Sequence, residues 1–283
     1  MRRFQCALLA AVAAIGFTSI ASAADMPVKA PVYKAAPAIA APNWAGWYVG
    51  ANAGWVGSTS NTITNTGTDT GAFGLGSSIG TEIPAAIDLG YSGFIGGGQL
   101  GYNWQAGNWV YGLEADFDGA SAKSSATIPD APAFGLFAPV TTNAARELDW
   151  LGTFRGRIGI TPAAPFLLYA TGGLAVGKHQ LGIGVVAPTA LPPANLFNQT
   201  STTSAGWTIG AGAEWMFAPH WSLKAEYLYV DLGRVSTTST NLTAFPPPIP
   251  FPTNVFTHSI DLRSNIVRVG LNYKFGGPVV AKY

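Results

Sequence analysis

The sequence predicts an all-β protein: an eight-stranded antiparallel up-and-down transmembrane β-barrel with short periplasmic turns and long extracellular loops. Three observations support this prediction. Only 10% of the 283 residues are charged, while 12% are aromatic, so the chain lacks the polar surface that a water-soluble domain needs. Apolar and polar residues alternate with a period of two in eight segments, as they do in strands with two different faces. Long and short connections between these segments also alternate along the chain.

The first residues have the features of a secretory signal peptide. A positively charged start, MRR, precedes an apolar stretch at residues 7–17, and small residues follow it. We expect residues 1–23 to form the signal peptide, with cleavage after Ala23. The alternative is an N-terminal membrane anchor, which the short apolar stretch disfavours. The single cysteine, Cys6, lies in this segment, so we expect the exported chain to have no cysteine.

Three further segments are expected in the exported chain. Residues 24–43 are rich in Ala and Pro without a usable period, which is typical of an extended linker, here in the periplasm. Residues 44–275 contain the alternating segments and are expected to form the barrel. Residues 276–283 are expected to be a short C-terminal extension.

The first alternating segment, GWYVGANAGW, shows the pattern clearly. Trp47, Val49 and Trp55 share one face with two alanines, while the other face is small or polar. The eight-residue step between the two tryptophans rises about 26 Å along a strand, or roughly 20 Å across a membrane at a tilt of about 40°. This is close to the apolar band of an outer-membrane barrel, and an aromatic ring at each end suits the two membrane interfaces.

The same alternation recurs in seven more segments, which gives the even number that a bacterial single-chain barrel needs. In the fourth strand the pattern assigns Leu148 and Trp150 to the outward face, whereas the phase of the fifth strand stays open. The seven segments are residues 94–104, 109–117, 148–158, 166–177, 207–217, 221–229 and 267–275.

The connections between these strands follow a strict order. Three links are short: QAGN, TPAAP and APH. The other four are long, and short links at one end with long ones at the other are typical of outer-membrane barrels. The expected long loops cover about residues 58–91, 119–147, 178–203 and 232–259.

Gly96, Gly98 and Gly101 have the G-x-G-x-x-G spacing of a dinucleotide-binding loop. Such a loop lies between a strand and a helix. Here a turn and another alternating segment follow, so we interpret the glycines as part of the second strand, where small residues let strands bend and let facing side chains fit. No cofactor is expected.

The predicted inward face carries charged residues of both signs. An eight-stranded barrel is just wide enough for side chains to fill it, and buried charges must be paired. We therefore expect a structural polar plug in the lumen, with a proton or ion path as the alternative. The expected plug residues are Glu114, Asp116, Arg155, Arg157, Glu214, Lys224, Glu226 and Arg268.

The sequence offers little support for catalysis, metal binding or nucleic-acid binding. His179, His220 and His258 are isolated and are expected to be exposed residues of turns, loops or strand ends, although Ser259 and Asp261 lie near His258. A hydrolase site would need these groups to converge, and a metal site would need closer ligands. A net charge of +1 without a polybasic run does not indicate a nucleic-acid partner.

The chain resembles the outer membrane immunogenic proteins, eight-stranded porin-like surface antigens of Gram-negative bacteria. The resemblance is carried by NWAGWYVGANAGW, GGGQLGYNWQAGNWVYGLEADF, LGTFRGRIG, LLYATGGLAVG, GWTIGAGAEW, WSLKAEYLYVDLG and VRVGLNYKF. It implies a barrel in the outer membrane that contributes to envelope integrity and presents loops to the environment or a host. Tyr273 and Phe275 resemble the terminal aromatic signal read by the barrel-assembly machinery. The chain departs from that pattern because GGPVVAKY follows, so Tyr283 is the alternative final aromatic.

These observations lead to one expected function and two alternatives. We expect a monomer embedded in outer-membrane lipid, with a structural role and no enzymatic activity. The first alternative is a narrow passive pore for ions or small solutes. The second is capture of a ligand by the loops, such as haem or a host protein.

Overall fold

The computed structural model describes residues 43–69, 84–129, 141–187, 194–240, 243–244, 249–250 and 254–276. The expected signal peptide with its cleavage after Ala23, most of the expected linker and residues 277–283 lie outside this part of the chain. The regular elements within the described ranges are strands. These ranges contain no helix with the length and apolarity needed to cross a membrane.

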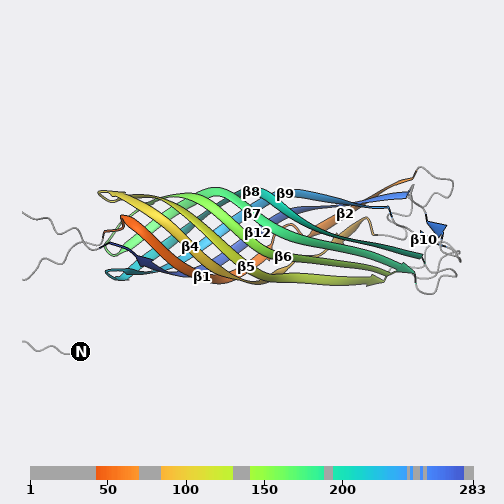
Figure 1. Cartoon of the computed structure of the whole chain (residues 1–283), viewed down its shortest axis with the longest axis horizontal. Helices are drawn as coiled ribbons and strands as arrows, with labels where there is room; N and C mark the ends of the chain where they lie inside the picture. Colours follow the sequence, from red (N-terminus) through yellow and green to blue (C-terminus); the bar gives the residue numbers. More distant parts are fainter. Residues whose placement is uncertain are drawn as a thin grey trace, which may run out of the picture. The chain divides into compact units, whose positions relative to one another are not determined.

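Eight long antiparallel strands wind around one axis (Figure 1). Their pairing runs from β1 through β4, β5, β6, β7, β8, β9 and β12 and returns to β1, so the sheet closes into a barrel. This confirms the predicted fold class. The eight strands are β1 (Gly46–Ser58), β4 (Ser92–Ala106), β5 (Trp109–Pro129), β6 (Thr141–Ile160), β7 (Phe166–Ala187), β8 (Ala194–Ala218), β9 (Trp221–Ser239) and β12 (Asn254–Lys274).

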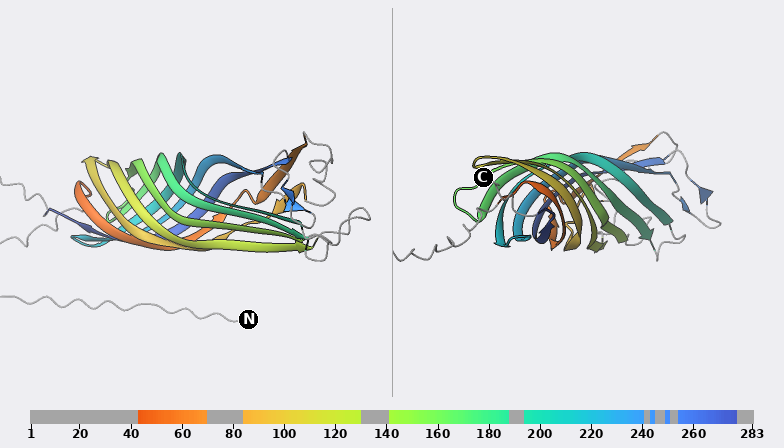
Figure 2. Two further views of the ribbon diagram at one scale, coloured as in Figure 1. Left: turned by 45° about the vertical axis from the view of Figure 1, so that its right-hand side comes forward. Right: turned by 60° about the vertical axis from the view of Figure 1, so that its left-hand side comes forward.

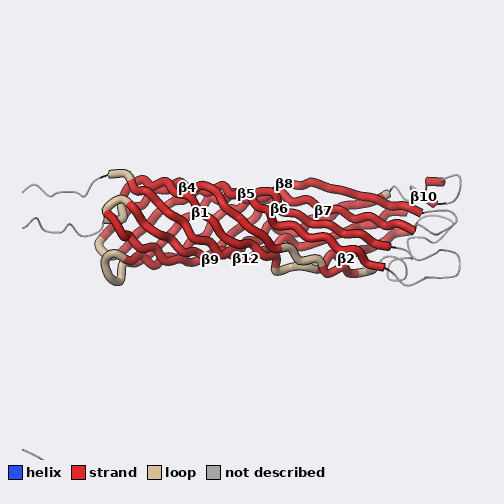
Figure 3. Tube along the Cα trace, turned by 90° about the horizontal axis from the view of Figure 1, so that it is seen from below, coloured by secondary structure: helices blue, strands red, loops and turns tan. Residues whose placement is uncertain are grey.

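Four short strands lie toward one end of the barrel. β2 (Thr62–Asp69) pairs with β12 above the end of β1, and β3 (Ala86–Asp88) pairs with β2. β10 (Thr243–Ala244) and β11 (Ile249–Pro250) form a small pair beside β8. Figure 3 shows tight turns at the opposite end.

The predicted alternation of faces is confirmed by exposure. In β1 the outward Trp47 and Trp55 are 55% and 58% exposed, whereas Tyr48 between them is 3% exposed. In β7, whose phase the sequence leaves open, Leu168 points outward at 47% exposure and Leu167 is fully buried. A lipid-facing band of exposed aromatic and aliphatic side chains therefore surrounds the barrel.

Two glycines inside the barrel make room for buried tyrosine rings. Gly101 of β4 lies opposite Tyr48 in register, and a Cβ added there would lie 2.3 Å from the tyrosine ring. Gly212 of β8 lies opposite Tyr169 in the same way, with the tyrosine oxygen 2.5 Å from such a Cβ. Gly101, the last glycine of the G-x-G-x-x-G spacing, thus has a packing role where β4 meets β1.

The expected outward position of Leu148 is wrong. Leu148 is 2% exposed and belongs to the buried apolar cluster. The pairing of β6 with both neighbours shifts register between Leu148 and Trp150. Because an extra residue at such a bulge reverses the faces beyond it, the simple alternation of β6 fails above Trp150.

The strands are longer than the sequence analysis predicts. β5, β6, β7, β8, β9 and β12 continue well beyond the lipid-facing band into segments expected to be loops. We call this part the extracellular extension: residues 56–69 and 84–91 with the ends of the six strands at 118–129, 141–149, 177–187, 194–206, 230–239 and 254–264. Figure 2 shows these strands running on past the closed part of the barrel.

Within the extracellular extension the wall separates into two sheets. Pairing of β8 with β9 stops at Trp207 and Asp231, and pairing of β4 with β5 stops at Ser92 and Lys123. One sheet then contains the ends of β5 to β8, and the other contains β9, β12, β2 and β3.

An apolar core fills the space between the two sheets. Leu148, Leu181 and Ile183 come from the first sheet, and Ile63 and Ile260 come from the second. All are 6% exposed or less. The interior of the barrel is therefore mainly apolar toward its extracellular end, where Arg146, His179 and His258 are also buried, whereas most of the buried charged side chains lie within the lipid-facing band.

Candidate functional site

The eight charged residues expected in the lumen are all buried inside the barrel. Each is at most 6% exposed, and Arg155 and Lys224 are fully buried. Their placement follows from register: Glu114 lies opposite Arg155 across β5 and β6, and Glu226 lies opposite Arg268 across β9 and β12. The remaining four expected residues, Asp116, Arg157, Glu214 and Lys224, point into the same space. We call this set, together with Asp118, the ion-pair network.

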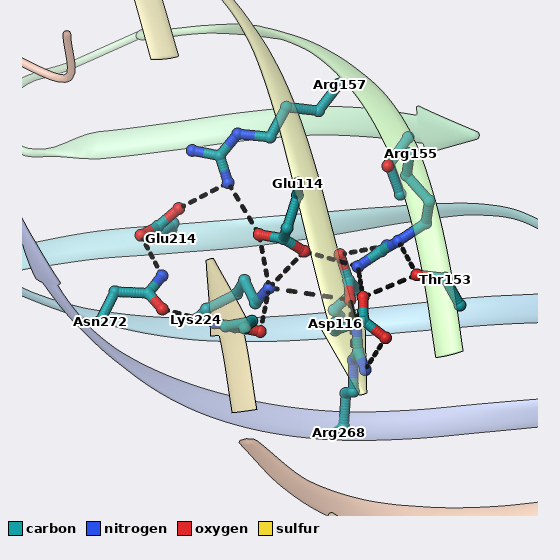
Figure 4. Close-up of polar contacts among 12 residues, drawn as sticks. Glu114, Asp116, Thr153, Arg155, Arg157, Glu214, Lys224, Arg268 and Asn272 are labelled. Carbon is teal, nitrogen blue, oxygen red and sulfur yellow. Dashed lines mark hydrogen bonds and ion pairs between the residues drawn. The ribbon is translucent and has the colours of Figure 1, made fainter. Parts of the chain in front are cut away.

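Glu114 lies at the centre of the ion-pair network (Figure 4). Its Oε1 accepts hydrogen bonds from Arg155 Nη2 at 2.5 Å and from Lys224 Nζ at 3.0 Å. Its Oε2 accepts one from the hydroxyl of Tyr48 at 2.6 Å and lies 3.7 Å from Arg157 Nη1. Glu114 belongs to β5. Its carboxylate therefore accepts hydrogen bonds from side chains of β1, of the adjacent β6 and of β9 across the lumen.

Arg155 and Arg268 join three further carboxylates. Arg155 contacts Asp116 at 2.8 Å and Glu226 at 3.0 Å. Arg268 contacts the same two groups, with Nη2 at 3.1 Å from Asp116 and 2.7 Å from Glu226, and its Nη1 reaches Asp118 at 2.6 Å. Planar guanidinium groups suit such shared carboxylate contacts, so the four strands β5, β6, β9 and β12 are tied together through the interior.

Arg157 lies between two aromatic rings. Its guanidinium carbon is 5.0 Å from the ring centroid of Tyr48 and 5.0 Å from that of Tyr169. Its Nη1 contacts Glu214 at 3.2 Å, and its Nε donates to Asn103 at 2.9 Å. Glu214 also accepts a hydrogen bond from Ser222. The ion-pair network therefore extends toward the end of the barrel that carries the short turns.

The ion-pair network holds five carboxylates and four cationic side chains. The carboxylates are Glu114, Asp116, Asp118, Glu214 and Glu226, and the cations are Arg155, Arg157, Lys224 and Arg268. Asp118 uses Oδ2 for Arg268, but its Oδ1 is buried without a hydrogen-bond partner among the described residues. The surplus negative charge is therefore concentrated at Asp118.

Arg146 joins the two sheets of the extracellular extension. This residue of β6 is 2% exposed, and its Nη1 donates to the carbonyl of Ser60 at 2.8 Å. Its Nη2 lies 3.5 Å from the carbonyl of Asp261, and its guanidinium carbon is 4.5 Å from the ring centroid of Tyr91. The β6 side of the apolar core is thus held to the β1–β2 connection and to β12.

The expectation of exposed histidines is wrong for His179 and His258. His258 is fully buried between β2 and β9, with Nδ1 at 2.7 Å from Asn65 Oδ1 and Nε2 at 3.0 Å from Ser239 Oγ. His179 is 6% exposed, and neither ring nitrogen has a partner among the described residues. Burial lowers the pKa of each histidine to about 4, and for His179 the charge of Arg146 adds to this effect.

The residues near His258 in sequence do not converge with it. Ser259 contacts Ser236 at 2.8 Å, and Asp261 pairs with the exposed Arg234 at 2.8 Å. Both point to the face opposite His258, as alternation along β12 requires. His220 lies in the turn between β8 and β9, with Nδ1 at 3.0 Å from the carbonyl of Lys274. The described residues contain no group of three or more potential metal ligands.

Sequence reasoning missed several partners of the ion-pair network. Tyr48, Tyr169 and Asn103 have inward parity, but an alternation of apolar and polar residues gives no reason to single them out. Asp118 has the same parity as Glu114 and Asp116, so the alternation along β5 already indicates that its side chain points into the lumen. The apolar core also left a signal, because KHQLGIGVV places His179, Leu181 and Ile183 on one face.

Comparison with known proteins shows what the chain is similar to. Residues 10–275 match the outer membrane protein beta-barrel domain family. The 31 kDa outer-membrane immunogenic protein of Brucella melitensis biotype 1 and of Brucella suis biovar 1 is 34% identical over 274 residues, which cover 95% of this chain and 98% of the relative. The 22 kDa outer membrane protein of Rhizobium leguminosarum bv. viciae is 32% identical over 48% of this chain and 52% of its own length.

The solved structures include a weaker likeness. OprG, an outer membrane protein of Pseudomonas aeruginosa, is 15% identical, with 82% of this chain and 97% of that chain covered and a TM-score of 0.43.

Proposed function

Because the chain belongs to the outer membrane protein beta-barrel domain family and lies in the Gram-negative outer membrane, we propose that it is a non-conducting structural barrel. In this proposal the lipid-facing band anchors the protein, the ion-pair network acts as a plug, and the extracellular end presents surface segments. The role is to support the integrity of the envelope and to carry antigenic surface, as the names of the immunogenic relatives suggest.

The observation that carries the proposal is that the lumen contains two successive barriers. Arg155, Lys224 and Arg268 fill the middle of the barrel and are paired on several sides. Toward the extracellular end, the buried apolar side chains and the buried cation Arg146 form the second barrier, since transfer of a further charge into mainly apolar surroundings is costly. An ion would have to displace both barriers, which disfavours the alternative of a narrow passive pore.

Conductance of the purified protein in planar lipid bilayers tests the proposal. We expect no steady single-channel steps, while a porin inserted in the same membrane serves as the positive control. Steady steps from the folded, heat-modifiable protein would support the narrow pore and contradict the plug. A deletion strain should in addition become more sensitive to detergent, and unchanged sensitivity would contradict the envelope role.

We also propose that Tyr273 and Phe275 serve as the signal for the barrel-assembly machinery. Phe275 is 48% exposed at the end of β12, and its ring centroid lies 5.3 Å from that of Tyr273. Phe275→Ala should reduce the fraction of heat-modifiable protein in the outer membrane, whereas Tyr283→Ala should not. The reverse result would assign the signal to Tyr283.

A further inference from the structure

A small cavity lies between the two sheets of the extracellular extension. Its lining comes from β6, β7 and β8 on one side and from β9 and β12 on the other, and its volume of about 10 Å³ is room for one water-sized particle. The apolar lining residues are Leu181, Val235, Ile260 and Leu262, and the polar ones are Arg146, His179, Gln180, Thr200 and Thr202. The cavity therefore places polar side chains of three strands at the edge of the apolar core.

His179 is unpartnered at this cavity. Its side chain is 6% exposed, and neither Nδ1 nor Nε2 forms a hydrogen bond with a described residue. A neutral imidazole carries one N–H donor in either tautomer, and a buried donor without an acceptor is costly. Buried polar groups that lack a protein partner commonly bond to a water molecule or an ion. His179 therefore indicates an occupant that accepts a hydrogen bond.

Arg146 brings a positive charge to the same cavity. Its Nη1 donates to the carbonyl of Ser60 and its Nη2 lies 3.5 Å from that of Asp261, while its Nε is buried without a hydrogen-bond partner among the described residues. It forms no ion pair with a described carboxylate, since the nearby Asp149 pairs with Lys178 at 3.2 Å. Burial lowers the pKa of Arg146, as it does for a cation in apolar surroundings. A buried charge needs a partner of opposite sign, so the occupant should be an anion.

We propose that this cavity binds a single chloride ion, held by the side chains of Arg146 and His179. Chloride accepts several hydrogen bonds at once, balances the charge of Arg146 and is only slightly larger than water. Thr202 supplies a third donor, because it lines the cavity and its hydroxyl forms no hydrogen bond with another described residue. Val235 on the opposite wall is only half-buried, which leaves room for the larger radius of the ion.

Other occupants fit the cavity less well. A water molecule would bond to His179 but would leave the charge of Arg146 unbalanced. A metal cation would be repelled by Arg146. A phosphate or a carboxylate needs more room than one water-sized particle takes.

An ion can reach the cavity through the wall between β8 and β9. Backbone pairing of these strands stops at Trp207 and Asp231. Thr202 and Val235 lie beyond this point, one on each strand, and both line the cavity. Entry therefore needs movement of side chains only. The site does not depend on the ion-pair network, so its failure would leave the proposed function intact.

Hydrogen exchange of the full-length protein in detergent micelles at neutral pH tests the proposal. Sodium chloride is compared with sodium gluconate at equal ionic strength, because gluconate is too large for the cavity and screens charges equally. We expect protection of residues 141–149 and 177–187 to rise with chloride and to saturate. An anion that binds only the closed form slows opening by 1 + [Cl⁻]/Kd, or roughly tenfold at about ten times Kd. Bromide should act like chloride.

Substitutions at the cavity make the test specific. His179→Phe keeps a ring but removes the donor and should abolish the response to chloride, whereas His179→Asn keeps an N–H donor and should retain part of it. Arg146→Met should also abolish the response, whereas Arg146→Lys should retain part of it. The response is a ratio between two salts, so it stays measurable in a loosened variant. The matched control, Arg234→Met, removes an exposed cation of the same extension and should respond like the wild-type protein.

Bromide also allows the ion to be located directly. In crystals grown from sodium bromide, we expect an anomalous peak within hydrogen-bond distance of Arg146 Nε and of one ring nitrogen of His179. Equal protection in chloride and gluconate, an unchanged response in His179→Phe, or the lack of an anomalous peak at the cavity would each overturn the proposal. Heat-modifiability on unboiled gels confirms that each variant is folded.

Discussion

At the scale of single residues, the five carboxylates and four cations of the ion-pair network are not equivalent. Asp116 is held by Arg155 and Arg268 and by the hydroxyl of Thr153 at 2.7 Å. Asp118 has Arg268 as its charged partner, and one of its oxygens has no hydrogen-bond partner among the described residues. Burial of an unpaired polar atom is costly, so the same substitution should have different effects at the two positions.

We predict that Asp116→Asn lowers the free energy of unfolding by about 3 kcal/mol, because it leaves two buried arginines short of a charged partner. Asp118→Asn should be neutral or stabilising, since it keeps an oxygen for Arg268 and removes the surplus negative charge. The measurement is the temperature at which each variant shifts to its unfolded position on a gel. Equal losses at the two positions would contradict the uneven charge distribution described here.

At the scale of elements, the extracellular extension is held by the apolar core and by Arg146. We predict that Arg146→Met loosens it, because the carbonyl of Ser60 loses its donor at 2.8 Å and the two sheets lose a link. Limited proteolysis should then cut the extension faster, while the temperature of the gel shift, set by the closed barrel, changes little. The matched control is Arg234→Met: Arg234 forms an exposed ion pair with Asp261, and pairs of this kind contribute little to stability. Equal cleavage of the two variants would contradict the role of Arg146.

The two buried histidines make the extracellular extension sensitive to acid. Each has a pKa of about 4 when folded, against about 6.5 in an unfolded chain. The unfolded state therefore binds more protons between these values, so stability is complete above pH 6.5 and falls as the pH drops toward 4. The pKa of the nearby Asp261 is lowered by its hydrogen bond from Arg234, so it titrates mainly below this window.

Hydrogen exchange between pH 7 and pH 4.5, corrected for intrinsic rates, tests this acid sensitivity. Protection of the β7 and β12 ends should decrease with pH in the wild-type protein. The double variant His179→Leu, His258→Gln should lose less protection over the same range, since neither replacement titrates. A pH dependence that persists unchanged in the double variant would assign the effect to other groups.

Part of this structure could be predicted from the sequence, and part could not. Pairs such as Trp47 and Trp55 mark the lipid-facing band because lipid demands apolar residues on every second position. Parity alone then places Glu114 and Arg155 inside. The bulge at Leu148 could not be predicted, because Leu148 and Trp150 are both apolar and have the same parity, although they lie on opposite sides of the bulge. The extracellular extension was missed because Thr, Ser and Gly are common in both loops and strands exposed to water, although KHQLGIGVV retains the alternation.

At the scale of the whole molecule, the barrel has two kinds of interior along its axis. Within the lipid-facing band the interior is charged and paired, which ties strands across the lumen. Beyond the band, where water surrounds the wall, the interior is mainly apolar, as in a sandwich of two sheets, with Arg146, His179 and His258 buried in it. The change in the interior occurs where the pairing of β8 with β9 and of β4 with β5 stops. The closed barrel and the extracellular extension should therefore respond separately to substitution.

The central claim is that the lumen is closed and filled, and the chain allows a direct measurement. The only cysteine, Cys6, lies in the expected signal peptide, so single cysteines can be introduced into a silent background. Thr171 and Thr208 face the interior at 6% and 2% exposure, and Thr→Cys is a small change at both. The measurement is the rate at which a charged methanethiosulfonate reagent modifies Thr171→Cys and Thr208→Cys in lipid vesicles. We predict no modification of the folded protein and rapid modification after boiling; rapid modification of the folded protein would show a water-filled lumen and contradict the account.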